Sequence, residues 1–171
     1  MRTLRRKYLA EFVYGGIDGT VTTFAVISGA FGAALNPAII LILGFANLFA
    51  DGFSMAVSNY LSTKSSRTLE GERANNGKRP VKTATATLVS FVVVGFIPLF
   101  PFVAAVFIPS IVPVQFHLSA VLTGLAFLFI GAAKSLVANK GVLVGALETL
   151  LIGGAAASIA FSVGYMLQGL V

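Results

Sequence analysis

Residues 9–35, LAEFVYGGIDGTVTTFAVISGAFGAAL, and residues 37–61, PAIILILGFANLFADGFSMAVSNYL, are two long apolar stretches joined by a tight turn. Each exceeds the roughly 20 residues that a helix needs to cross a bilayer. Each also carries an aspartate near its middle, Asp18 in the first and Asp51 in the second. A carboxylate at the bilayer centre costs about 2.5–3.5 kcal/mol, and such groups usually face a bundle interior and mark an ion or proton path.

The composition of the whole chain fits a membrane protein. Of its 171 residues, 57% are hydrophobic and 11% are charged, whereas a soluble domain has about 25% charged residues. The chain has no cysteine, which excludes disulfides, zinc–thiolate sites and a cysteine nucleophile. The net charge of +6 comes from basic residues at the ends of apolar segments, which is typical of contact with anionic lipid and not of nucleic-acid binding.

The sequence predicts an all-α membrane protein with one transmembrane domain, 1–171, and five transmembrane helices. Breaks at Asn36-Pro37, at 109–117 and at Asn139-Lys140-Gly141 separate the apolar runs, since Gly, Pro and Asn favour turns and helix ends. The predicted helices are 8–34, 37–62, 83–108, 114–138 and 142–170, with a cytosolic connector at 63–82. Pro98 and Pro101 should kink or end the third helix.

The distribution of Lys and Arg predicts the topology. The N-terminal cluster, the 63–82 connector and Lys134 with Lys140 are basic, while the two other turns carry no Lys or Arg. Basic loops stay on the cytosolic side. We therefore expect a cytosolic N-terminus and a C-terminus on the opposite side.

The polar residues of the first two helices fall on matching stripes. Asn47, Asp51, Met55 and Asn59 are spaced by four residues, and Glu11, Asp18 and Thr22 share a face of the first helix. A rise of about 1.5 Å per residue places Asp18, Asp51 and Met55 at similar depth near the midplane. The two stripes are predicted to line one path, and Glu11, close to the cytosolic surface, is either its entrance or an interfacial charge. Gly16 and Gly19 are expected to leave space for an ion beside Asp18.

Structural roles for these residues stay open at this point. Either aspartate can serve only to bond a neighbouring helix, and Met55 can simply fill the core, because methionine packs irregular gaps. Lys134 and Glu148 are expected to pair or to extend toward the interface. His117 is expected to be solvated.

The ligand types favour a divalent transition metal. Carboxylate and amide oxygens beside a thioether tilt the choice from magnesium or calcium toward ions such as Fe(II) or Mn(II). Composition alone leaves metal and proton transport both open. A carboxylate in a low-dielectric site can take up a proton when the metal departs, which offers a route to antiport.

The motifs FVYGGIDGTVTTFAVISGA and ANLFADGFSMAVSNYLSTKS resemble the vacuolar iron transporter family, whose first helix has a GGxDG-type motif and whose second has a G-x-S-M stretch followed by a tyrosine. The resemblance implies a homodimeric five-helix transporter that moves Fe(II) and similar ions out of the cytosol in exchange for protons. It also implies a path between first helices, with Asp18 and Met55 as metal-path residues.

The sequence departs from this family at three places. Asn47 falls where many members have a glutamate, and Asp51 falls where a small residue is common. Residues 63–82 contain only Glu70 and Glu72 as acids, in place of the family's long glutamate-rich cytosolic domain.

Two functions other than metal export are open. A non-transporting membrane scaffold is one alternative. An intramembrane aspartyl protease is another, although its GxGD and YD motifs differ from the Gly15-Gly16-Ile17-Asp18 and Ala50-Asp51 found here. We therefore expect no catalytic residues and no cofactor, with Fe2+ or Mn2+ as the transported substrate. The short connector favours a prokaryotic plasma membrane over a vacuolar one.

Overall fold

The computed structural model describes residues 8–70, 77–138 and 141–170, and these residues form helices and short connections with no strand among them. The all-α prediction is confirmed for this part of the chain. The α-helices are α2 (Leu9–Gly32), α3 (Pro37–Glu70), α4 (Pro80–Gly95), α5 (Phe100–Phe107), α6 (Gln115–Ala138) and α7 (Val142–Leu167). Three 3-10 segments accompany them, η2 (Ile97–Leu99), η3 (Pro109–Val114) and η4 (Gln168–Leu170).

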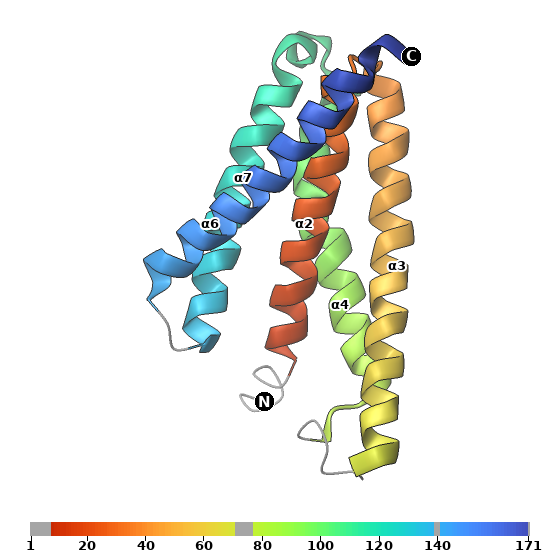
Figure 1. Cartoon of the computed structure of the whole chain (residues 1–171), viewed down its shortest axis with the longest axis vertical. Helices are drawn as coiled ribbons and strands as arrows, with labels where there is room; N and C mark the ends of the chain where they lie inside the picture. The colour runs from red at the N-terminus through yellow and green to blue at the C-terminus, as the bar shows by residue number, and fades with distance from the viewer. Residues whose placement is uncertain (1–7, 71–76, 139–140, 171) are drawn as a thin grey trace.

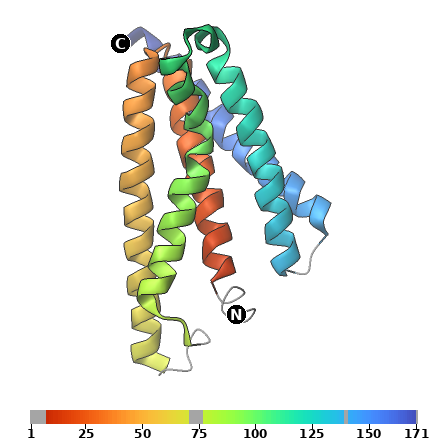
Figure 2. The same cartoon turned by 180° about the vertical axis from the view of Figure 1, so that it is seen from behind.

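Helix α2 runs through the middle of the bundle (Figure 1). It packs against α3, α4, α6 and α7. Helix α7 crosses it diagonally on one side, and α4 lies on the other side, as the reverse view shows (Figure 2). Helices α6 and α7 diverge from α3 toward the end where α3 terminates.

Glycines on two faces of α2 allow this central position. Any Cβ at Gly15 or Gly19 would meet backbone atoms of α4, and any Cβ at Gly29 or Gly32 would meet backbone atoms of α7. Small residues let membrane helices approach closely. The lack of a side chain at Gly15 and Gly19 therefore brings α4 against α2.

Helix α2 nevertheless lacks an apolar stretch comparable to those of the other long helices. Among the residues that the structure describes, four helical stretches are long and apolar enough to cross a membrane: Pro37–Leu69, Pro80–Phe107, Pro109–Ser135 and Val142–Leu170. Helix α2, with 24 residues, is not among them, because Asp18 and its glycines and threonines lower its hydropathy. Because it is surrounded by four other helices, α2 needs few lipid-facing apolar side chains.

The turn between α2 and α3 lies at Asn36-Pro37, as the sequence predicts. The backbone N–H of Ala38 donates to Oδ1 of Asn36 over 2.8 Å, and Pro37 is the first residue of α3. Asn36 therefore caps the helix. Ala34 adopts the left-handed conformation, with φ of 54°, which closes the turn.

Pro98 and Pro101 break the third predicted helix, as expected, into α4, η2 and α5. The two prolines cannot donate backbone hydrogen bonds, so the regular helical ladder stops there. Ser119 of α6 donates its hydroxyl to the Pro98 carbonyl over 2.6 Å. This bond ties the break to α6.

The boundaries around the connector differ from the prediction. Helix α3 continues past residue 62 to Glu70, and α4 begins at Pro80 instead of residue 83. The sequence from Thr63 to Glu70 contains no Gly or Pro, and polar residues do not stop a helix that leaves the hydrocarbon. Part of the predicted connector, 71–76, and the basic N-terminal cluster lie outside the described residues.

The described basic residues gather at one end of the bundle. Lys64 and Arg67 lie near the end of α3, Lys78, Arg79 and Lys82 lie around the start of α4, and Lys134 lies in the last turns of α6. The opposite end holds the 33–36 turn, η3 and η4 (Figure 1).

Candidate functional site

Two carboxylates meet in the middle of the bundle, between α2 and α3. Asp18 and Asp51 are both half-buried, and they are close enough for their charges to interact. Their helices are neighbours joined by the short 33–36 turn. The structure thus brings together the two aspartates that the sequence predicted to share a depth.

Thr22 and Asn47 complete this group. The Thr22 hydroxyl donates to the backbone carbonyl of Asp18 over 2.9 Å. The Asn47 side-chain amide donates to the Thr22 hydroxyl oxygen over a long 3.4 Å, which leaves the Asn47 carbonyl oxygen available. We refer to Asp18, Thr22, Asn47 and Asp51 as the α2–α3 polar cluster.

The α2–α3 polar cluster offers oxygen ligands to a cation. Two carboxylates, an amide oxygen and a hydroxyl suit divalent ions, which complete their coordination with water when the protein supplies few ligands. Within the ranges that the structure describes, no group of three or more His, Cys, Asp or Glu side chains is placed to hold a metal. The α2–α3 polar cluster thus combines two carboxylates with the neutral oxygen atoms of Asn47 and Thr22.

Met55 lies on α3, one turn beyond Asp51, but its surroundings are apolar. It is partly buried and packs against a core cluster that includes Ile27, Leu48 and Phe91. Its role as a metal ligand stays a prediction, and its packing supports a contribution to the core.

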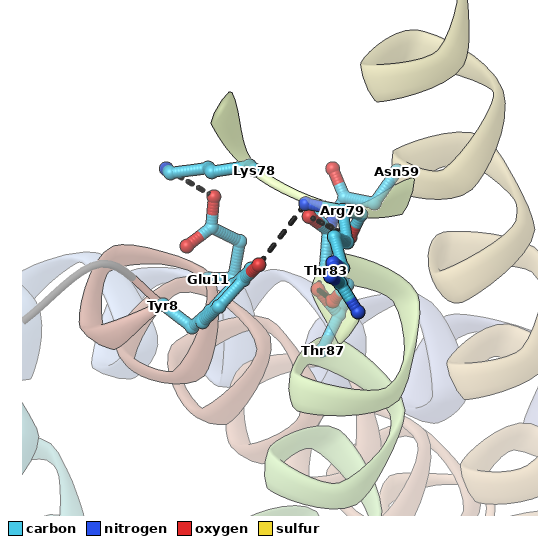
Figure 3. A network of polar contacts seen from close by, with 7 residues as sticks. All are labelled: Tyr8, Glu11, Asn59, Lys78, Arg79, Thr83 and Thr87. Carbon is cyan, nitrogen blue, oxygen red and sulfur yellow. Dashed lines mark hydrogen bonds and ion pairs between the residues drawn. The ribbon is translucent and has the colours of Figure 1, made fainter. Parts of the chain in front are cut away.

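Asn59, a predicted path-lining residue, points to α4 instead of α2. Its side-chain amide donates to the Thr87 hydroxyl over 2.8 Å, and Thr87 donates in turn to the carbonyl of Thr83 over 3.1 Å. Figure 3 shows this chain of contacts. Asn59 therefore joins α3 to α4 and is not part of the α2–α3 polar cluster.

Glu11 lies in the first turn of α2 and pairs with Lys78 (Figure 3). The two side chains are only 13% and 20% exposed, respectively. The second carboxylate oxygen of Glu11 is buried without a hydrogen-bond partner. Nearby, the backbone N–H of Arg79 donates to the Tyr8 hydroxyl over 3.0 Å. The predicted entrance residue is thus held by the segment that precedes α4.

The glycines around Asp18 do not have the predicted role. A Cβ at Gly19 would lie against the backbone of Phe91, and one at Gly16 would touch Val94. Both neighbours belong to α4. The space left by these glycines is filled by a helix and is not free for an ion.

Two of the residues involved were missed by sequence reasoning. Lys78 is 67 positions from Glu11, so no spacing rule connects them. Ser90 donates its hydroxyl to the Phe12 carbonyl over 2.5 Å, which links α4 to α2. A signal for the α4 residues exists, because Thr83, Thr87 and Ser90 follow the spacing of one helix face.

The structure confirms one peripheral prediction, the pairing of Lys134 with Glu148, and the solvation of His117 stays a prediction. Lys134 and Glu148 form an exposed ion pair of 3.2 Å between α6 and α7. His117 is exposed in the first turn of α6.

Comparison with known proteins covers most of the chain. A family model described as the VIT family matches residues 9–78 and 68–165. The "Vacuolar iron transporter homolog 4" of Arabidopsis thaliana is 30% identical over 162 residues, which cover 88% of this chain and 78% of the relative.

Other relatives match more locally or with more gaps. The "Vacuolar iron transporter" of Plasmodium berghei is 41% identical over 61 residues, 36% of this chain, and the chain spans only 22% of that relative's length. The "Vacuolar iron transporter 1" of Eucalyptus grandis is 24% identical over 217 aligned positions, which cover 92% of this chain and 86% of the relative. Because this chain has only 171 residues, that relative carries residues with no counterpart here.

Proposed function

Since the chain belongs to the VIT family, we propose that it is a transporter that exports a divalent transition metal, Fe(II) or Mn(II), from the cytosol in exchange for protons. The relatives named vacuolar iron transporters support the substrate class. The observation that carries the proposal is the pair of half-buried carboxylates, Asp18 and Asp51, near the middle of the neighbouring helices α2 and α3. Ionisable groups at this depth usually mark an ion path.

The proposed route follows the polar residues along α2. The ion enters at the end where Glu11 pairs with Lys78, and it is held by Asp18 and Asp51 with oxygens from Asn47 and Thr22. When the divalent ion leaves, a carboxylate of the cluster takes up a proton, which replaces one of the two positive charges that the ion carried. Exchange of one cation for another avoids leaving two unpaired carboxylates in a low-dielectric site.

Five membrane spans and a cytosolic N-terminus belong to this proposal. Helix α2 would be the fifth span, shielded by the four helices around it. The basic end of the bundle would face the cytosol. A homodimer would place a second copy beside the half-exposed α2–α3 polar cluster, and a prokaryotic plasma membrane would be its location.

The experiment is metal flux in proteoliposomes with an imposed pH gradient, with Fe(II), Mn(II), Co(II) and Zn(II) as substrates. We expect gradient-dependent uptake that falls at least tenfold in Asp18→Ala and in Asp51→Ala. Glu148→Gln is the matched control, because this exposed carboxylate on α7 lies outside the proposed path. Full flux in Asp18→Ala would refute the site, and no flux for any ion in the unaltered protein would favour a scaffold.

The same assay separates the two roles of Met55. Met55→Leu conserves volume and should cost less than about 1.5 kcal/mol of stability. If the thioether is a ligand, flux of Fe(II) falls while thermal stability is kept. Unchanged flux would leave Met55 as a core residue only.

A further inference from the structure

A groove runs between α3 and α4 on the outer surface of the bundle. Its apolar part has a volume of about 280 Å3 and is lined by Phe53, Ala56, Val57 and Tyr60 of α3 and by Val81, Ala84, Thr85 and Leu88 of α4. Phe53 and Val81 are 64% and 65% exposed. The two helices lie side by side along this part of the bundle (Figure 2).

The groove continues into a basic hollow at the connector end. Lys64, Arg67, Thr68 and Pro80 line a cavity of about 270 Å3. Lys64 follows Tyr60 by one helical turn, and Pro80 directly precedes Val81, so the apolar and basic parts adjoin on both helices. None of the described residues that line either part is acidic.

The dimensions match one leaflet of a bilayer. From Phe53 to Lys64 is eleven residues along α3, or about 16 Å, and half of the hydrocarbon core is about 15 Å. With Lys64 at the edge of the hydrocarbon, from which its long side chain extends to the lipid phosphates, Phe53 reaches the midplane. The groove thus spans the depth of an acyl chain and ends in positive charge at headgroup depth.

We propose that this groove is a binding site for an anionic phospholipid. One acyl chain lies between α3 and α4, and the phosphate group contacts Lys64 in the basic hollow that Arg67 also lines. Basic pockets between membrane helices on the cytosolic side are suited to anionic headgroups. The site is independent of the α2–α3 polar cluster and of the transport function proposed above.

A second copy of the chain is a poorer occupant. A two-fold axis along the membrane normal would bring the same surface of both copies together. Lys64 and Arg67 would then approach their own counterparts, and like charges at a shared interface are unfavourable. A lipid phosphate carries the complementary charge.

The chain contains no tryptophan, so a single introduced tryptophan reports on one place. Thr85→Trp places the indole in the groove, and Val89→Trp is the matched control one turn along α4, 47% exposed and not a lining residue. Each variant is reconstituted in phosphatidylcholine vesicles that contain an equal fraction of brominated phosphatidylglycerol or brominated phosphatidylcholine. We expect at least twofold selectivity for phosphatidylglycerol in quenching at position 85 and none at position 89.

Charge removal tests the headgroup contact. In the Thr85→Trp background, Lys64→Gln should abolish the selectivity, whereas Lys82→Gln should keep it, because Lys82 is an exposed basic residue of the same region that does not line the groove. Equal loss in both variants would mean a nonspecific surface potential and would overturn the proposal. Absence of quenching by either lipid at position 85 would mean that protein covers the groove, which would also overturn it.

A second measurement does not require tryptophan variants. Added phosphatidylglycerol should raise the Tm of the unaltered chain and of Lys82→Gln in phosphatidylcholine nanodiscs, because a ligand of the folded state stabilises it. The shift should vanish in Lys64→Gln. Equal shifts in all three proteins would refute the site.

Discussion

Lys78 and Glu11 form an ion pair on which the stability of the bundle is expected to depend. Their ion pair joins the start of α2 to the segment before α4, and both side chains are largely buried. Removal of one partner from such a pair leaves an uncompensated charge, which costs more than the pair itself contributes.

We therefore expect Lys78→Met to lower the free energy of unfolding by about 1–3 kcal/mol, measured by thermal unfolding in detergent. Glu11→Gln added to Lys78→Met should recover much of that loss, since the unpaired charge is then gone. Lys134→Met is the control, because its pair with Glu148 is exposed and should contribute about 0–1 kcal/mol. Equal losses in Lys78→Met and Lys134→Met would contradict this account.

For single residues, the sequence predicted contacts between helices that follow each other in the chain better than contacts between helices that do not. The spacing of Asn47 and Asp51, with Asp18 and Thr22 opposite, anticipated the α2–α3 polar cluster, because the 33–36 turn forces those two helices together. The partner of Asn59 was not foreseen, since the sequence does not say which helix packs beside α3 at that level. Lys78 reaches Glu11 only because α4 crosses α2, which is a property of tertiary packing.

Among the elements, the packing of α7 against α2 depends on backbone contact. A Cβ at Gly164 would collide with the carbonyl oxygen of Gly29 and approach the backbone of Ala33. Backbone atoms cannot rotate away as a side chain does, so the two helices would have to separate.

Gly164→Ala should therefore destabilise the bundle by about 1–3 kcal/mol. Gly154→Ala in the same helix should stabilise it by about 0.5–1 kcal/mol, since a Cβ there meets nothing within 4 Å and alanine favours helix over glycine. The measurement is Tm in detergent for both variants. A similar shift of the same sign in both would show that helix propensity, and not the α2–α7 contact, controls the effect.

The ends of the elements were predictable where proline or glycine sets them. Asn36-Pro37, Pro98 and Pro101 act locally through φ and missing donors, so their effects hold in any packing. The predicted end of α3, at residue 62, is too early. The polar residues that follow mark the end of the apolar part of the helix, and the helix itself continues to Glu70. The limited hydropathy of α2 can be read from its sequence. Its packing against four other helices cannot, because that depends on the tertiary structure.

For the whole molecule, the absence of cysteine makes the proposed topology directly testable. Single-cysteine variants at Asn36, Ser65 and Gly169 can be labelled in intact cells with an impermeant maleimide. An N-terminal epitope tag on the same variants can be detected with an antibody. Asn36→Cys and Gly169→Cys should react from outside, while Ser65→Cys and the tag should be reached only after permeabilisation. A tag accessible together with Asn36→Cys would mean that α2 does not cross the membrane.

The central position of α2 also has a consequence in time. It is the first described helix to leave the ribosome, yet α7, which packs along it, follows roughly 110 residues later, or about 5–20 s at usual elongation rates. Until then α2, with its aspartate and buried threonines, has only part of its permanent surroundings. The speed of translation through the intervening helices therefore sets how long α2 is without its contacts to α7.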